Sequence, residues 1–158
     1  HFTLPHTVVD GGATRFHSVQ NGLAAIADTA AALVAVHDGV RPFVAADVIE
    51  RCFVAAEQSG AAIPVVPVVE TLRHVDDNGA SHTVPRADYR LVQTPQTFSV
   101  ELLRRAYAQP FTEAFTDDAS VVEALGHDIT LVEGNRDNIK LTTPSDLLMA
   151  EAIVAASR

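Results

Sequence analysis

The sequence predicts an α/β fold in which a mostly parallel sheet is flanked by helices and carries a projecting β-arm. Short apolar runs that suit strands alternate along the chain with longer segments of helical periodicity, which is the order found in α/β proteins. The run at 61–66 is apolar almost throughout, as expected of a parallel strand that is buried on both faces. No linker or repeat divides the 158 residues, so a single domain over 1–158 is expected.

Composition indicates a globular protein with a sizeable core, since 47% of the residues are hydrophobic and 20% are charged. The net charge of −9 argues against non-specific binding to nucleic acids or membranes, although a local basic cluster would still hold a small anion. The single cysteine, Cys52, excludes a disulfide framework within the chain and suits a reducing, cytoplasmic compartment. No apolar run approaches the roughly 18 residues of a membrane span.

The first 66 residues are expected to hold three strands and two helices. The first helix shows an apolar stripe at helical spacing, and either Thr14 or Ser18 is placed to cap its start. Gly60 is expected to end the second helix. The predicted strands are 7–9, 33–36 and 61–66, and the predicted helices are 14–27 and 45–59.

Residues 67–90 are expected to form an arm that leaves the sheet. Short β-like runs alternate there with the turn sequence Asp-Asp-Asn-Gly at 76–79, and an Asn-Gly pair between such runs favours a hairpin. The core is expected to resume at 91–93, and Thr143 to cap a last helix that begins at Pro144. The remaining predicted helices are 100–108, 117–125 and 144–156, and the remaining strand is 129–132.

The segment His-Asp-Gly-Val-Arg-Pro-Phe at 37–43 is the strongest candidate for a functional site. It follows the predicted strand at 33–36, and it places Asp38 and Arg41 three residues apart. Ligands of open α/β sheets bind outside the carboxyl ends of the strands, so this pair stands where chemistry is expected. The alternative is a surface ion pair at a loop end, which is a common feature of proteins.

Two further segments suit a polyol or an anion. Residues 93–98 cluster two amides and two hydroxyls around a proline, which suits recognition of a polyol or a base, although Thr97 or Ser99 would also cap the following helix. Lys140 shares the face of a short extended segment with Asn138 and Thr142. That arrangement is compatible with a phosphate site, or with the decoration of an edge strand.

Other motifs have simpler structural interpretations. Asp10-Gly11-Gly12 precedes a helix whose N-terminus favours anions, but the same residues would make a tight turn. The acidic residues of 116–120 complement a helix dipole. The seven histidines show no metal-ligand spacing, and no constellation suggests a hydrolase. His37 is expected to be packed and hydrogen-bonded rather than catalytic.

Taken in order, these segments resemble the 2-C-methyl-D-erythritol 4-phosphate cytidylyltransferase family of the non-mevalonate isoprenoid pathway. Each segment is modest alone, whereas the ordered set covers nearly the whole chain. The segments that carry the resemblance are GGATR at 11–15, SVQNGL at 18–23, HDGVRPF at 37–43, QTPQ at 93–96, TD at 116–117 and NIK at 138–140.

The resemblance implies the Rossmann-like fold of the nucleotide-diphospho-sugar transferases, with the β-arm reaching across a homodimer. It implies transfer of CMP from CTP to 2-C-methyl-D-erythritol 4-phosphate, with release of pyrophosphate and formation of 4-diphosphocytidyl-2-C-methyl-D-erythritol. The implied cofactor is Mg²⁺ bridging the triphosphate, and Asp38 is the candidate for an outer contact to that ion. The expected ligands are CTP and a polyol phosphate, with neither a nucleic acid nor a membrane as partner.

By the same resemblance, the site residues take three kinds of role. Arg86 would orient the substrate phosphate from the partner's arm, and Lys140 would bind phosphate and position the nucleophile; these two are the catalytic candidates. The methylerythritol phosphate would be held by Asp38, Arg41, Thr71, Arg86 and Thr94, and the cytidine nucleotide by Gly12, Ser18, Gly39 and Lys140.

One departure from the family and two alternatives follow. The family begins with a strand and a Gly-rich loop whose Arg and Lys cradle the triphosphate, and no such segment occurs here. The chain is therefore expected to be an N-terminally incomplete nucleotidyltransferase domain that does not turn over by itself.

A sister family acting on ribitol 5-phosphate shares two of the signatures, but Arg86, eight residues before Thr94, favours methylerythritol phosphate. A non-catalytic dimerising module is the other alternative.

Overall fold

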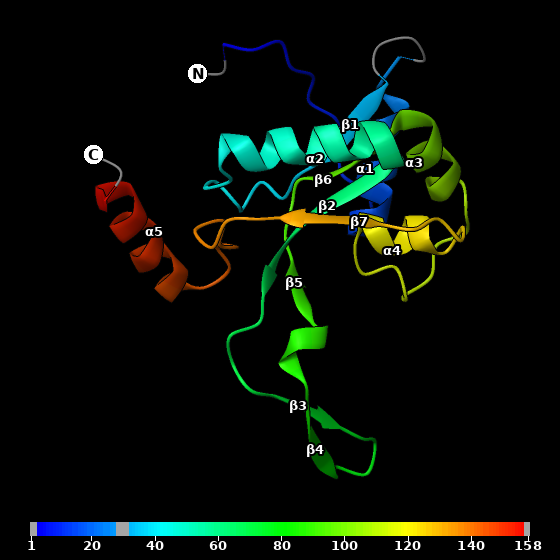
Figure 1. The fold of residues 1–158 in the computed structure, drawn as a ribbon. Helices are drawn as coiled ribbons and strands as arrows, with labels where there is room; N and C mark the ends of the chain where they lie inside the picture. Colours follow the sequence, from blue (N-terminus) through cyan, green and yellow to red (C-terminus); the bar gives the residue numbers. More distant parts are fainter. Residues whose placement is uncertain (1–2, 28–31, 157–158) are drawn as a thin grey trace.

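The computed structural model describes residues 3–27 and 32–156, which form an α/β domain around a mixed sheet of five strands (Figure 1). Three strands pair directly with the central strand β2, and β1 extends the sheet beyond β6. The strands of this sheet are β1 (Leu33–Val36), β2 (Ala61–Pro67), β5 (Arg90–Val92), β6 (Gln96–Ser99) and β7 (Thr130–Glu133).

Strand directions place several loop segments at one edge of the sheet. β2 and β7 are parallel, and β1 and β2 are both antiparallel to β6, so β1, β2 and β7 run in the same direction while β5 and β6 run in the opposite one. The carboxyl ends of β1 and β7 therefore share an edge with the start of β6. This common direction agrees with the predicted α/β sheet, and that edge is where ligand sites are expected.

Helices cover both faces of the sheet (Figure 1). α2 (Ala46–Ser59) packs against β2, β6 and β7. The opposite face carries α1 (Arg15–Ala24), α3 (Val100–Tyr107) and α4 (Asp118–Glu123). Successive side chains of a strand point to opposite faces, so coverage of both faces explains why 61–66 is buried throughout. The core between the sheet and these three helices includes Phe16, Leu23, Ile63, Phe98, Leu103 and Val122.

Local sequence signals mark where these helices begin and end, close to the predicted positions. The Thr14 side chain accepts a hydrogen bond from the His17 backbone and caps α1, so Thr14 rather than Ser18 is the cap. Gly60 ends α2 in the left-handed region, with φ of 82°. Asp117 caps α4 in a capping box with Ser120. The predicted helices at 14–27, 45–59, 100–108 and 117–125 are confirmed within a few residues.

The arm and the last helix stand away from the sheet (Figure 1). β3 (Leu72–Val75) and β4 (Ser81–Val84) form a separate antiparallel hairpin around the predicted turn, in which Gly79 has φ of 81°. A short 3₁₀ turn, η1 (Arg86–Asp88), leads back to the sheet. α5 (Pro144–Ala156) begins at the proline predicted to start it.

Two sequence-based expectations are wrong, and one strand was not predicted. Residues 7–9 form no strand; Val8 is 88% exposed, and no described strand pairs with this segment. β6 was not expected, because its polar residues suggest a loop, yet they lie in the middle of the sheet. The core does not resume at 91, since Leu91 and Val92 are exposed although β5 pairs with β2. Only Gln93 of that segment is buried.

Cys52 is a core residue, as its helical position suggests. It is free and fully buried on α2, and burial raises the pKa of its thiol to about 11. The thiol is therefore protonated and unreactive at neutral pH. Among the described residues, the helices are all too short or too polar to cross a membrane.

Candidate active site

A cavity of about 180 Å³ opens at the sheet edge where β1 ends and β6 begins. Four residues singled out by the sequence, Asp38, Arg41, Thr94 and Lys140, line it together. They come from three segments that are far apart in the chain. The cavity is also lined by Arg15, Val92, Gln93, Gln96, Thr116 and Asp117.

Three cations converge on the Asp38 carboxylate. Lys140 Nζ lies 3.1 Å and Arg41 Nε 3.4 Å from Oδ2, and Arg15 Nε lies 3.7 Å from Oδ1. The side chain of Asp38 is 15% exposed, whereas that of Lys140 is 47% exposed. Asp38 is thus the common partner of three cations that line the cavity, and the ammonium group of Lys140 remains accessible to an incoming anion.

The ionisation of Asp38 follows from this surrounding. Burial by itself raises the pKa of the carboxyl group, but the hydrogen bond and charge of Lys140, together with the charges of Arg15 and Arg41, outweigh it. The pKa of Asp38 therefore lies below its ordinary value, and the group is a carboxylate at neutral pH.

The loop after β1 is fixed by hydrogen bonds to Thr94. The backbone N–H of Asp38 donates to Thr94 Oγ1 at 3.0 Å, and the same hydroxyl lies 2.9 Å from His37 Nδ1. His37 Nε2 in turn lies 2.9 Å from the carbonyl oxygen of Arg41. His37 is therefore a hydrogen-bonded loop residue, as expected. The motif at 37–43 and the motif at 93–98 are joined by these bonds into one structure.

Asn138 joins the Lys140 segment to both of these motifs. The side-chain Nδ2 of Asn138 donates to the Thr94 backbone carbonyl at 2.8 Å, and the backbone carbonyl of Asn138 accepts from Arg41 Nη1 at 2.8 Å. The Leu141 N–H donates to the Val40 carbonyl at 2.9 Å. Because Asn138 is completely buried, its own two bonds are shielded from water, and together the three bonds hold Lys140 beside Asp38.

Several lining residues belong to motifs that the sequence singles out but were assigned no role in the site. Arg15 belongs to a quoted motif but resembles an ordinary first-turn residue of a helix. Gln93 and Gln96 suggest a loop, yet both are buried, and Gln96 Nε2 donates to Asp117 Oδ2 at 2.8 Å. Buried glutamines at a sheet edge require partners, and those partners lie in distant segments. The sequence marks these two amides as a candidate binding motif, but it carries no signal for the distant contacts that place them in the cavity.

The glycines and serine assigned to the nucleotide, Gly12, Gly39 and Ser18, do not line the cavity. The Gly12 N–H donates to Ser18 Oγ at 2.9 Å, and Ser18 Oγ donates to the Thr14 carbonyl at 3.1 Å. A Cβ on Gly12 would collide with His17, whose backbone carbon would be 2.7 Å away. Gly12 thus permits a close approach that no other residue allows, whereas a Cβ on Gly39 would meet open space.

Thr71 and Arg86 lie on the arm and do not line the Asp38 cavity. Both residues are exposed. Arg86 donates a hydrogen bond from Nη1 to the carbonyl of Val69 within the arm. The structure therefore does not bring these two residues together with Asp38, Arg41, Thr94 and Lys140 within one copy of the chain.

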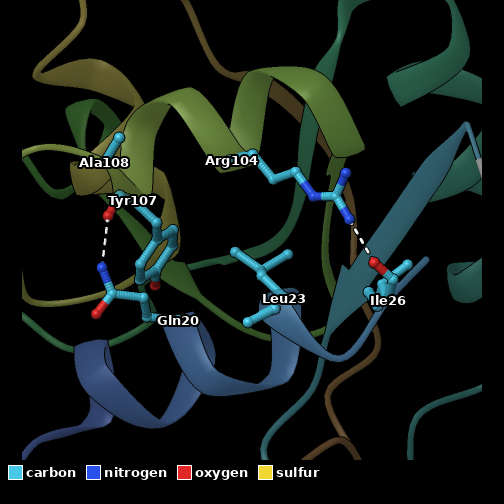
Figure 2. A pocket seen from close by; sticks show the side chains of 7 residues that line it. Gln20, Leu23, Ile26, Arg104, Tyr107 and Ala108 are labelled. Atoms are coloured by element: carbon cyan, nitrogen blue, oxygen red, sulfur yellow. Dashed lines mark hydrogen bonds between the residues drawn. The ribbon is translucent and has the colours of Figure 1, made fainter. Parts of the chain in front are cut away.

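A larger cavity, of about 400 Å³, lies between α1 and α3 (Figure 2). Its polar groups are already used within the protein: Arg104 Nη2 donates to the Ile26 carbonyl at 2.5 Å, and Gln20 Nε2 donates to the Tyr107 carbonyl at 2.9 Å. No carboxylate or lysine of the described residues lines it. The charged Asp38 cavity is therefore the better candidate for phosphate chemistry.

Comparison with known proteins agrees with the site. The family model for 2-C-methyl-D-erythritol 4-phosphate cytidylyltransferase (IspD) matches residues 3–156. Proteins of that name from Phocaeicola vulgatus and Bacteroides thetaiotaomicron are 60% and 62% identical over 154 residues, which is 98% of this chain and 69% of each relative. The crystal structure of the Thermus thermophilus enzyme of the same name superposes with a TM-score of 0.80 at 44% identity, covering 91% of this chain and 70% of that one.

The match is to the predicted family, and it separates the alternatives. It selects methylerythritol phosphate over ribitol 5-phosphate, and an enzyme over a non-catalytic module. The family model matches nearly the whole chain, and the two relatives share 60% and 62% of their aligned residues with it. The chain therefore belongs to the 2-C-methyl-D-erythritol 4-phosphate cytidylyltransferase family, the nucleotidyltransferases that couple CTP to this polyol phosphate in isoprenoid synthesis.

Proposed function

We propose that the Asp38 cavity binds 2-C-methyl-D-erythritol 4-phosphate and aims its phosphate at CTP. The observation that carries this proposal is the convergence of Arg15, Arg41 and Lys140 on one carboxylate in a cavity open to solvent. Asp38 would accept hydrogen bonds from the polyol hydroxyls, and Arg41 and Thr94 would complete that pocket. Lys140, the most exposed of the four, would contact phosphate and help to position the nucleophile.

The reaction needs positioning and charge neutralisation from these side chains more than covalent chemistry. A phosphate oxygen of the substrate attacks the α-phosphorus of CTP and forms a new P–O bond. The bond between the α-phosphorus and the oxygen bridging to the β-phosphate breaks, and pyrophosphate leaves with that electron pair. Lys140 would lower the repulsion between the two anions. Gly12, Ser18 and Gly39, which do not line the cavity, would contact the cytidine nucleotide.

Arg41 provides the test of the polyol pocket. Arg41→Lys keeps the charge but removes the Nη1 donor to the Asn138 carbonyl, so we expect the KM for methylerythritol phosphate to rise about tenfold and the KM for CTP to change less than about twofold. The measurement is steady-state pyrophosphate release by the full-length protein with each substrate varied in turn. An equal rise in both KM values, or no rise in either, would contradict the proposed pocket.

We further propose that Mg²⁺ accompanies CTP. Within 3–27 and 32–156, no cluster of three or more His, Cys, Asp or Glu side chains suits a metal ion, so the triphosphate itself would supply most ligands and Asp38 at most an outer contact. Bound there, Mg²⁺ would neutralise triphosphate charge. Turnover is expected to stop in excess EDTA and to return with added Mg²⁺; activity that persists in EDTA would contradict this.

We also propose that the enzyme is a homodimer whose arms exchange, and that it acts in the cytoplasm. Support for the dimer comes from apolar side chains that stand exposed on the arm and on β5, a pattern typical of interaction surfaces. Support for the compartment comes from the free thiol of Cys52. The exposed side chains are Val69, Val75, Tyr89, Leu91 and Val92.

A further inference from the structure

A buried carboxylate behind the cavity has no part in the function proposed above. Asp118, in the first turn of α4, is 0% exposed. Arg15 Nη2 donates to its Oδ2 at 2.6 Å, and the Tyr107 hydroxyl donates to its Oδ1 at 2.6 Å. Burying a carboxylate is costly unless it is paired and hydrogen-bonded. Here both oxygens are occupied, one by a group that also reaches the cavity.

Arg15 faces two carboxylates at once. While Nη2 binds Asp118, Nε lies 3.7 Å from Oδ1 of Asp38. The other oxygen of Asp38, Oδ2, faces Arg41 and Lys140. The two edges of the Asp38 carboxylate are therefore held by different groups: one edge by Arg15, which is tied to the core, and the other by two cations that line the cavity.

The helix that carries Arg15 is fixed against α3. The Phe16 ring stacks on the Tyr107 ring with centroids 4.6 Å apart, and Gln20 Nε2 donates to the Tyr107 carbonyl at 2.9 Å (Figure 2). Burial and the charge of Asp118 also raise the pKa of the Tyr107 hydroxyl, which keeps it protonated as a donor. The position of the Arg15 guanidinium is thus set by packing and by hydrogen bonds.

We propose that Arg15 is a positioning residue for Asp38, and that Asp118 and Tyr107 form the anchor that fixes it. When the substrate phosphate enters and draws Lys140 and Arg41 toward itself, Arg15 keeps the Oδ1 edge of Asp38 in place, so that the carboxylate stays aimed at the polyol. This inference rests on the proposed function in one respect, the entry of the substrate phosphate into the Asp38 cavity.

Two variants of the full-length protein test this role. Arg15→Lys keeps a charge for the buried Asp118 but loses the planar fork that reaches two carboxylates. We expect kcat/KM for methylerythritol phosphate to fall about thirtyfold, with the KM for CTP and the unfolding midpoint little changed, because misplacing a positioned group by about 1 Å can cost up to a hundredfold. Tyr107→Phe removes one hydroxyl remote from the cavity, and we expect kcat/KM for methylerythritol phosphate to fall about threefold to tenfold with the KM for CTP little changed. Its unfolding midpoint is expected to fall, because Oδ1 of the buried Asp118 loses its donor.

Arg51→Lys is the matched control. Arg51 pairs with Asp47 at 2.8 Å on α2, and its side chain, 40% exposed, resembles that of Arg15 at 37%, but it lies outside the cavity. We expect this control to leave kcat/KM for methylerythritol phosphate and the KM for CTP unchanged. If Arg15→Lys affects both substrates alike and lowers the unfolding midpoint, the residue is merely structural and the proposal is overturned.

Asp38→Asn, measured beside these variants, separates the failure of this inference from the failure of the proposed function. If Asp38→Asn is inactive while Arg15→Lys and Tyr107→Phe behave like the wild type, only the positioning role of Arg15 is overturned. If Asp38→Asn is itself fully active, the Asp38 cavity is not the substrate site, and both proposals fall together. If all three variants lose kcat/KM for methylerythritol phosphate while the KM for CTP changes little, both proposals are supported.

Discussion

Replacing Asp38 with asparagine is expected to lower kcat/KM for methylerythritol phosphate by about a hundredfold or more, which corresponds to about 3 kcal/mol of transition-state stabilisation. Asparagine keeps the size of the side chain but removes the negative charge to which Arg15, Arg41 and Lys140 are directed. It also turns two N–H groups toward cations. The three cations would then rearrange, and the polyol would lose a charged acceptor.

The pH dependence of stability gives this prediction a second measurement. The folded-state pKa of Asp38 is depressed, so its ionised form stabilises the fold above the unfolded-state pKa of about 3.9, and that stabilisation is lost as the pH falls through the lower, folded-state pKa. The stability difference between wild type and Asp38→Asn should therefore be full at neutral pH and shrink in acid. Urea unfolding at several pH values measures it.

Asp47→Asn is the control for Asp38→Asn. Asp47 pairs with Arg51 on the exposed face of α2, and the hydrogen bond from Arg51 lowers its pKa too, but it lies outside the cavity. We expect Asp47→Asn to turn over like the wild type. Retention of more than about a third of the wild-type kcat/KM by Asp38→Asn, a loss below about 0.7 kcal/mol, would contradict the assignment of Asp38.

Two inactive variants are expected to regain activity when they share a dimer. Arg86 lies on the arm and does not line the cavity of its own chain, so we propose that it serves the partner's cavity. Arg86→Ala and Lys140→Ala should each lose most turnover. In a mixed dimer, one site would combine an intact cavity with an intact arm, so co-expression should restore about one quarter of the wild-type activity under random pairing.

Pairing Asp38→Asn with Lys140→Ala provides the control for this complementation. Both substitutions lie in the cavity, so every site in such a mixed dimer carries a defect and no recovery is expected. Recovery there would mean that activity returns by another route. Absence of recovery in the Arg86 mixture, with mixed dimers demonstrated by two affinity tags, would show that the arm does not act across the dimer.

Elements with a strong local signal were predictable from the sequence. All five predicted helices were placed within a few residues, because caps such as Thr14 and the stop at Gly60 act within one turn of chain. The strand at 61–66 was recognised because burial on both faces requires a continuous apolar run. The hairpin of the arm was predicted from its Asn-Gly turn.

β6 shows where local signals fail. Gln96 and Thr97 are polar, yet they are almost fully buried in the middle of the sheet. The amide of Gln96 makes this possible by bonding to Asp117 and to the Ala119 backbone, which lie more than twenty residues away. The converse holds for Val8, a strand former in a segment that pairs with no described strand, because a strand exists only through its neighbour.

By itself, the sequence determined the family and the α/β class, and it singled out Asp38, Arg41, Thr94 and Lys140 as candidates for the site, because the identity and spacing of these residues are local properties. Only the tertiary structure decided that these four meet in one cavity, that Arg15 joins them through the buried Asp118, and that Thr71 and Arg86 lie outside it. The physical reason is that proximity between distant segments depends on strand order and direction, and on buried hydrogen bonds such as those of Asn138.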